Sequence, residues 1–190
     1  MEFEDVIYKR RTIRRFLQRP IEVKLLKQLI DYGRVAPAGN NIQPVEYIIV
    51  TSDEQRAALF SMVRWAASLP KEMRTPEEGK RPMAYLIVLV NTKIKKNAQM
   101  DVGGAVENIL LGAANHGLGT CWMGAIDRKK IQKHFEIPSH YEVSHVISLG
   151  YPAEKSTMEP HEDSFKYWKD EEGNMHVPKR SLEDVILKIE

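Results

Sequence analysis

Five cations and one hydroxyl lie within seven residues near the start of the chain. The segment runs from Lys9 to Arg15 in the order KRRTIRR and is followed by Phe16. Guanidinium groups bind phosphate oxygens in pairs, and hydrogen bonds to ionised groups are stronger than those between neutral groups. Fixed cations on both sides of the Thr12 hydroxyl therefore predict a phosphate site.

A second segment, residues 37–44, is built mainly from small and amide side chains. It reads PAGNNIQP and leads directly into the strand-like run 45–50. Such a loop lets the backbone approach a flat ligand closely, and its amides can both donate and accept hydrogen bonds. With the cations, it matches the two ends of a phosphorylated aromatic cofactor. The two segments together predict an enzyme that binds flavin mononucleotide (FMN).

Each segment also has a simpler interpretation. The cation run could be a solvated helix end, a localisation signal or a nucleic-acid patch. Residues 37–44 could merely connect a helix to a strand, because glycine and asparagine are common in turns. A third segment, residues 117–125, reads GLGTCWMGA. It is either a helix end followed by a core strand, or a backbone ledge for a flat ligand with an unhindered Gly124 N–H.

No other grouping of side chains suggests acid–base or nucleophilic chemistry by the protein itself. The six histidines are scattered and form no ligand pair with a carboxylate, so no metal site is predicted. Cys121, the single cysteine, lies in an apolar run and is interpreted as a packing residue. No catalytic residue is assigned, which favours an enzyme whose chemistry is carried by a bound cofactor.

The composition is that of an ordinary soluble globular protein. The chain has 190 residues, of which 43% are hydrophobic and 28% charged, and its net charge is +2. General nucleic-acid binders have a broader basic excess, so no nucleic-acid partner is expected. No apolar run reaches the ~18 residues of a spanning helix, and no signal peptide is visible at the N-terminus. We expect one domain over residues 1–190, a cytoplasmic location and no membrane association.

The hydrophobic patterns predict an α+β fold with a small sheet. Apolar residues between 102 and 114 recur at helical spacing, which predicts a central helix from Asp101 to Gly117. The apolar run 83–90 predicts a strand covered on both faces. Residues 69–82 are expected to form a surface excursion, and residues 154–176 are expected to be irregular. The other expected helices are 21–35, 53–65 with Asp53 as N-cap, a short one from Asp127 and one from Ser181 onward, and the other three of four strands are 45–50, 119–125 and 142–151.

Four motifs, in this order, resemble those of the FMN-dependent nitroreductase superfamily in its short-chain form. Arg10 to Arg14 resembles the family's N-terminal phosphate and ribityl motif, and residues 36–44 are similar to its Ala-Pro-Ser-x-x-Asn-x-Gln-Pro motif. Residues 117–125, with 149–154 further on, resemble its flavin-ledge strand and its Gly-Tyr-Pro strand end. Residues 178–180 resemble its last phosphate contact. The resemblance extends over nearly the whole chain.

The resemblance implies an α/β/α sandwich with a small, mostly antiparallel sheet, assembled as an intertwined homodimer with FMN at the interface. It also implies oxidation of NADH or NADPH and reduction of nitroaromatics, quinones or related small acceptors in a ping-pong hydride mechanism. The partner chain's loop would reach the flavin ring, and the Gly124 N–H would lie near the hydride-accepting nitrogen. The implied cofactor-binding residues are Arg10, Arg11, Thr12, Arg14, Lys179 and Arg180 for the phosphate and ribityl chain, Pro37, Ala38, Gly39 and Asn41 from the partner, and Met123 and Gly124 along the ring.

Two positions depart from the family pattern. Ala38 stands where the family usually has serine, and Val45 replaces a frequent tryptophan. The short segment 69–82 leaves little room for a long lid, so the acceptor pocket is either open or covered by residues 154–176. Other superfamily activities remain as alternatives: dehalogenation, flavin cleavage, or a mainly flavin-binding, redox-responsive role.

Overall fold

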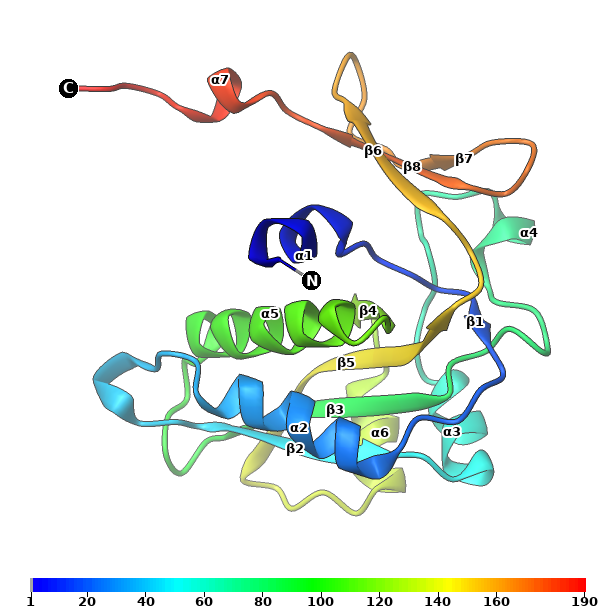
Figure 1. The fold of residues 1–190 in the computed structure, drawn as a ribbon. Helices are drawn as coiled ribbons and strands as arrows, with labels where there is room; N and C mark the ends of the chain where they lie inside the picture. The colour runs from blue at the N-terminus through cyan, green and yellow to red at the C-terminus, as the bar shows by residue number, and fades with distance from the viewer. Residues whose placement is uncertain (1) are drawn as a thin grey trace.

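The structure is a computed structural model that describes residues 2–190, and it is organised around a central sheet with helices on both faces (Figure 1). Its elements in chain order are α1 (Phe3–Lys9), β1 (Phe16–Leu17), α2 (Val23–Arg34), the 3-10 turn η1 (Gly39–Asn41), β2 (Val45–Val50), α3 (Asp53–Phe60), α4 (Lys71–Arg74), β3 (Ala84–Asn91), α5 (Gln99–Asn115), β4 (Gly119–Met123), α6 (Arg128–His134), β5 (Tyr141–Pro152), β6 (Ser156–Pro160), β7 (Trp168–Lys169), β8 (Met175–Lys179) and α7 (Leu182–Val185).

The main sheet is built around β5, the longest strand. β3 pairs with one edge of β5, while β4 and β1 pair one after the other with its opposite edge. β2 completes the sheet on the far side of β3. All of these pairings are antiparallel, as expected from the sequence. The sheet has five strands rather than the four predicted, because the two-residue β1 adds to it.

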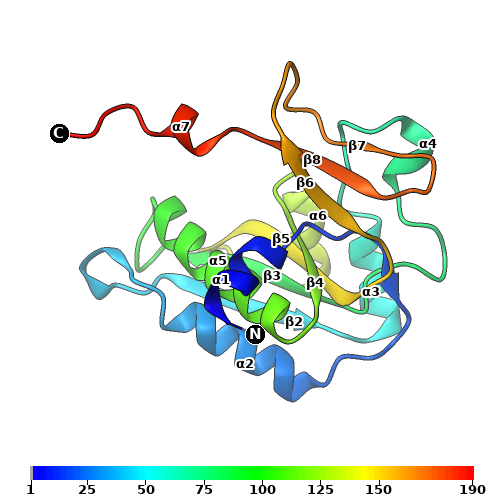
Figure 2. The ribbon, with the colours of Figure 1, turned by 45° about the horizontal axis from the view of Figure 1, so that its top comes forward.

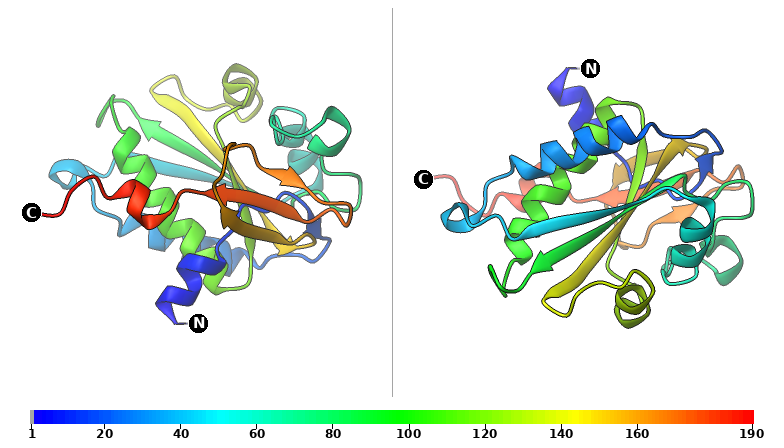
Figure 3. Two further views of the ribbon diagram at one scale, coloured as in Figure 1. Left: turned by 90° about the horizontal axis from the view of Figure 1, so that it is seen from above. Right: turned by 90° about the horizontal axis from the view of Figure 1, so that it is seen from below.

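Alternate residues of β3 pack on opposite faces of the sheet, as the two-residue period of a strand requires. Leu86 and Val88 join one core cluster with α2 and α5, whereas Ile87 and Leu89 join a second cluster with α3 and α6. Because both faces are covered, residues 84–90 are all buried. The predicted α+β class and sandwich arrangement are confirmed. Seen from above, α5 lies across the strands of the sheet (Figure 3).

Helix boundaries differ from the sequence expectation by one to several residues. Asp101 lies in the first turn of α5, which begins at Gln99. Asp53 is the first helical residue of α3, and Ser52 is the N-cap. Asp127 is the N-cap of α6 as expected, and its side chain accepts the Lys130 backbone N–H.

The predicted extension of α3 to Trp65 is wrong, since the helix ends at Phe60. Beyond that point the backbone turns to pair with the segment after β4. Val63 forms a bridge with Ile126, and the N–H of Arg64 donates to the Ala125 carbonyl at 2.9 Å. These long-range bonds replace the helical ones.

Residues 154–176 are more regular than the sequence predicted. β6, β8 and β7 form a second, three-stranded sheet in this order, with β6 and β8 parallel. It stands apart from the main sheet, beside α4 (Figures 1 and 2). The expectation of an irregular segment was therefore wrong for residues 154–176. Residues 69–82 are mostly exposed, as expected for a surface excursion, and contain the short helix α4.

The C-terminal segment extends away from both sheets (Figures 1 and 2). The expected final helix is only the four-residue α7, closed by a capping box between Ser181 and Asp184. Residues 181–190 are all exposed. Among them, Leu187 is 101% and Ile189 is 86% exposed. The segment carries apolar side chains that the rest of residues 2–190 leave exposed.

Candidate functional site

The predicted phosphate segment lies across the ends of two strands of the main sheet. After α1 the chain runs beside β4, where Thr12 forms a parallel bridge with Thr120. The N–H of Ile13 donates to the Thr120 carbonyl at 2.9 Å. Phe16 then begins β1, which pairs with the end of β5. The cations are therefore held on the edge of the sheet and not on a free loop.

Two glycines allow this close approach. Gly119 of β4 and Gly150 of β5 are cross-strand partners. A Cβ on Gly119 would lie 2.7 Å from the Cβ of Ile13, and one on Gly150 would lie 2.6 Å from the ring of Phe16. No real side chain tolerates such distances. The paired glycines form the surface on which the cation segment rests.

The first cations border a hollow of about 380 Å³ at the C-terminal end of α5. Arg10 and Arg11 both line it. The Nε of Arg10 lies 3.4 Å from a Glu107 carboxylate oxygen. The Nε of Arg11 is buried and has no hydrogen-bond partner among residues 2–190, and burial, followed by the neighbouring Arg10 charge, lowers its pKa. Buried donors are normally paired, so Arg11 brings a cation without a bonded carboxylate or carbonyl at its Nε to the wall of the hollow.

The remaining predicted phosphate contacts lie outside this hollow. The Arg14 guanidinium lies over the Tyr167 ring, 4.9 Å from its centroid. Lys179 ends β8 and is exposed, and the guanidinium of Arg180 donates to the Asp184 carbonyl. Neither Lys179 nor Arg180 lines the hollow. A single chain thus brings together Arg10, Arg11 and Thr12, but not the cations at the end of β8.

The predicted ring-binding loop is held in an unusual backbone conformation. Asn40, Asn41 and Gln43 have φ values of 54°, 55° and 53°. Asparagine tolerates this left-handed region better than most residues, and such outliers are concentrated at functional sites. The loop is fixed by Asp101, whose carboxylate accepts the Gly39 N–H at 2.8 Å. This support positions the loop against the start of α5.

The loop and the cations lie at opposite ends of α5. Asp101, in the first turn, holds Gly39, whereas Ala114 and Gly117 at the other end line the cation hollow. A helix of 17 residues is about 25 Å long. Pro37 and Ala38 border a separate hollow of about 130 Å³. Within one chain, the loop that carries Pro37, Ala38, Gly39 and Asn41 therefore lies far from the cations.

The predicted ledge lies along β4. Thr120, beside the cations, and Gly124 are four residues apart, about 14 Å in a strand. Gly124 is exposed and borders a hollow of about 530 Å³. Met123 is buried on the face covered by α3 and α6, so only its backbone can contribute to the ledge. An elongated ligand lying along β4 would contact the cations at one end and Gly124 at the other.

Sequence reasoning missed the residues that support this arrangement. Glu154 and Asp101 are buried carboxylates that bind the backbone of the two predicted segments. His145 lies beside Gly124. Its ring packs edge-on against Trp122, with 5.2 Å between the ring centroids, and its Nδ1 lies 2.8 Å from the Ser144 hydroxyl. Burial lowers the pKa of His145. Glu154 lay within a recognised motif, but nothing local in the sequence indicated its contacts.

The structure is an α+β protein in which a hollow lined by Arg10 and Arg11 lies at one end of β4 and the exposed Gly124 follows its other end. The chain belongs to the nitroreductase family, whose model matches residues 7–151.

Comparisons with individual proteins agree with this family. A protein of Archaeoglobus fulgidus, named for NADH dehydrogenase or NAD(P)H nitroreductase activity, is 28% identical over 84% of this chain and 91% of its own. A nitroreductase family structure from Clostridium novyi is 28% identical, with a TM-score of 0.67, over 80% of this chain and 87% of that one. A structure from Desulfovibrio desulfuricans, solved with FMN, shares the fold with a TM-score of 0.74 at 20% identity. The match covers 100% of this chain and 98% of that one.

Proposed function

We propose that this protein is an FMN-dependent NAD(P)H oxidoreductase that reduces nitroaromatics, quinones or related small acceptors in a ping-pong cycle. The observation that carries the proposal is the arrangement along β4. An unpaired, buried Arg11 nitrogen lies at one end, and an exposed Gly124 lies at the other. This spacing suits a ligand with a phosphate at one end and a flat ring at the other.

The residues present fit FMN. Arg10, Arg11 and Thr12 would hold the phosphate, and Arg14 would lie beside the ribityl chain. The backbone of Met123 and Gly124 would lie along the ring. When bound, FMN supplies the hydride chemistry. The protein's part is to bind and orient it and to keep the ring face at Gly124 open to substrates.

We further propose a homodimer in which each flavin lies between the two chains. The loop with Pro37, Ala38, Gly39 and Asn41 cannot reach the cations of its own chain, and it would serve the partner's site. The exposed apolar residues of the C-terminal segment support association, because soluble monomers rarely expose contiguous apolar surface. Lys179 and Arg180, which precede this segment, would join the phosphate site when the dimer forms.

The relatives indicate the substrates to test. One, from Pseudomonas putida, is named 4-nitrobenzoate reductase and is 25% identical over 83% of this chain. Another, from Thermotoga neapolitana, is named iodotyrosine deiodinase at 24% identity, so dehalogenation is the second activity to assay. No helix within residues 2–190 is long and apolar enough to cross a membrane. A cytoplasmic location remains a prediction.

The test is an absorbance spectrum of the purified protein followed by steady-state assays. We expect a flavin spectrum, FMN on release, and oxidation of NADH or NADPH that depends on 4-nitrobenzoate or a quinone. A colourless protein that does not bind added FMN would refute the proposal. Bound FMN without NAD(P)H oxidation would indicate a flavin-binding role, and turnover with iodotyrosine alone would favour dehalogenation.

A further inference from the structure

A buried carboxylate binds the backbone of the cation segment. The side chain of Glu154, just after β5, is only 4% exposed. Its Oε1 accepts the backbone N–H of Arg14 at 2.6 Å and that of Arg15 at 3.3 Å. These amides lie two and three positions after Thr12 in the chain. Glu154 therefore fixes the path of the backbone within the segment that carries the proposed phosphate-binding residues.

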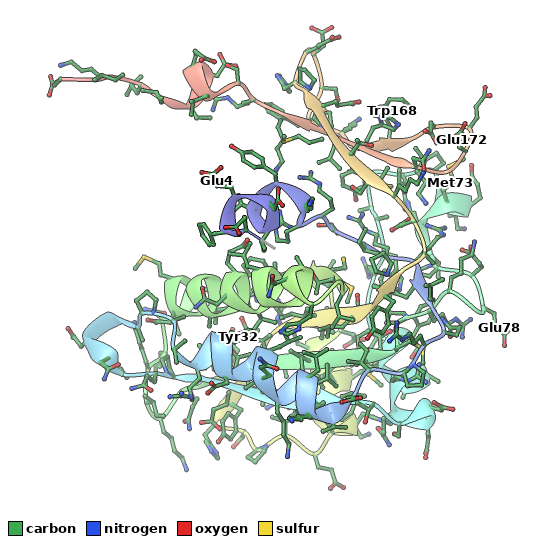
Figure 4. The ribbon with its side chains drawn as sticks, viewed as in Figure 1. Glu4, Tyr32, Met73, Glu78, Trp168 and Glu172 are labelled. Carbon is green, nitrogen blue, oxygen red and sulfur yellow. The ribbon has the colours of Figure 1, made fainter. Side chains whose placement is uncertain are left out.

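The charge of Glu154 is balanced by two cations. Lys169 of β7, whose side chain is 7% exposed, places its Nζ 3.0 Å from Oε2. Arg15 places a guanidinium nitrogen 3.6 Å from the same oxygen. Arg15 is also paired with Glu77 at 2.8 Å and donates to the Met73 carbonyl at 3.2 Å. The network ties the cation segment to the second sheet and to α4, the region of Met73 and Glu172 in Figure 4.

The location of Glu154 is unfavourable on charge alone. It lines the same hollow as Arg10 and Arg11, where an anion is proposed to bind. A carboxylate there repels a phosphate, and burying its charge has a further cost in desolvation. Its hydrogen bonds to the Arg14 and Arg15 amides give a physical reason for its presence, because a carboxylate is the strongest acceptor available for two adjacent N–H groups.

We propose that Glu154 is a positioning residue for phosphate recognition, acting through the backbone of Arg14 and Arg15 and neutralised by Lys169. The inference rests on the proposed FMN function. Glu154 holds the segment so that Arg10 and Arg11 face the hollow, with Thr12 next to them in the chain. Lys169 allows the carboxylate to remain charged beside an anion site.

The test compares the affinity for FMN with that for riboflavin, which lacks the phosphate. Both are titrated by flavin fluorescence into the apoprotein. In Glu154→Gln we expect the FMN affinity to fall roughly tenfold relative to riboflavin, the loss that accompanies a weakened charge-assisted contact. If Glu154 acted only as a nearby negative charge, its removal would raise FMN affinity. If it were merely structural, both flavins would weaken together. Either result overturns the proposal.

A double variant separates positioning from stability and from net charge. Glu154→Leu with Lys169→Met removes one buried anion and its cation together, so the net charge is unchanged and no ion is left unpaired. Replacing a buried pair by apolar residues is often tolerated, so this variant carries the test if Glu154→Gln does not fold. We expect this variant to fold with a lowered melting temperature, because the Arg14 and Arg15 amides lose their acceptor, and its FMN affinity to be lowered roughly tenfold relative to riboflavin. An unchanged ratio would contradict the proposal.

Glu77→Gln is the matched control. It removes the other carboxylate paired with Arg15, but its side chain is 47% exposed and it makes no contact with the Arg14 or Arg15 amides. We expect the ratio of FMN to riboflavin affinity to stay within about twofold of the wild type. A loss equal to that in Glu154→Gln would assign the effect to Arg15 pairing and overturn the role of Glu154. A wild-type protein that binds neither flavin would refute the proposed function itself.

Discussion

Arg10 and Arg14 flank the Thr12 bridge but face different surroundings. Arg10 borders the hollow at the C-terminal end of α5, whereas the Arg14 guanidinium lies over the Tyr167 ring. Each contact to an ionised ligand group is worth about 1.5–3 kcal/mol. We therefore expect Arg10→Ala and Arg14→Ala each to weaken FMN binding by roughly tenfold or more. Fluorescence titration measures this, and unchanged affinity in both variants would refute the phosphate assignment.

Gly124 is the position where the ledge can be tested without disturbing the fold. A Cβ there would lie 3.4 Å from His145, an ordinary contact, so Gly124→Val should fold. Its branched side chain would crowd the ring, and we expect slower flavin reduction by NAD(P)H or loss of FMN. Stopped-flow absorbance of the bound flavin measures this rate.

Cys121→Ser is the companion variant on the same strand. The thiol is buried, and burial raises its pKa, so it is no reactive thiolate. The rate of flavin reduction should stay within about threefold of the wild type, a change of less than 1 kcal/mol in the barrier. A folded, FMN-loaded Cys121→Ser protein without activity would show that the thiol takes part in the reaction.

The residue types of the cation segment could be predicted from the sequence because they are contiguous. The residues that support this segment and the loop could not be predicted. Glu154 contacts Arg14 across 140 positions, and Asp101 contacts Gly39 across 62. A buried carboxylate bonded to distant backbone amides leaves no local pattern, since its partners are N–H groups that every residue except proline has.

Among the elements, the loop that begins with η1 depends on α5 through one carboxylate. Asp101 accepts from Lys95 at 2.6 Å as well as from Gly39, and these contacts, Lys95 first, lower its pKa. Asp101→Ala should destabilise the protein by about 1.5–3 kcal/mol. It should also speed amide exchange at residues 39–43. Urea denaturation and hydrogen exchange measure the two effects.

Asp53→Ala is the control for this change. Asp53 also pairs with a cation, Arg56, but its side chain is 96% exposed. An exposed pair contributes at most about 1 kcal/mol. If Asp101→Ala cost no more than Asp53→Ala and left exchange at residues 39–43 unchanged, Asp101 would not hold the loop.

The second sheet is stabilised by a histidine between two carboxylates. His176 of β8 places its ring nitrogens 3.1 Å from Glu159 and 3.2 Å from Asp170, and Trp168 stacks on it at 4.1 Å between centroids. The hydrogen bond to Asp170, with further help from Glu159, raises the pKa of His176. Hydrogen bonds from Asn174 first, then His176, lower the pKa of Asp170 to about 2.

The raised pKa predicts a pH dependence with a definite sign. A His whose folded pKa is raised stabilises the protein fully below its unfolded pKa of about 6.5, and the effect is lost as pH rises through the folded pKa. Asp170 stays ionised throughout this range. The melting temperature should therefore fall more between pH 6 and pH 8.5 in the wild type than in His176→Gln. Parallel curves for the two proteins would contradict this role.

Long elements with strong periodicity were predictable, and short ones were not. β3 and α5 have continuous apolar runs or apolar positions at helical spacing, and both were predicted within about two residues. β7 has two residues, and β6 is the polar sequence STMEP. Their pairing depends on β8 and on the His176 cluster, which no alternation of apolar and polar residues indicates. The short pairing that ends α3 was missed for the same reason.

At the scale of the whole molecule, the two halves of the proposed site are separated by the length of α5. In a two-fold dimer, the loop of each chain would complete the site built on the cations of the other. In such a dimer, a chain with defective cations and a chain with a defective loop would each be inactive as homodimers. Their heterodimer would contain one site with both defects and one site with none.

The separation along α5 therefore predicts complementation between chains. Arg10→Ala/Arg11→Ala and a loop variant such as Gly39→Asp, each inactive alone, should regain activity when unfolded together and refolded. Random pairing would restore about a quarter of the sites, and analytical ultracentrifugation should show dimers throughout. Activity in a monomer, or a mixture as inactive as its components, would place the whole site in one chain. If the prediction holds, two damaged copies of the gene in one cell could supply a function that neither supplies alone.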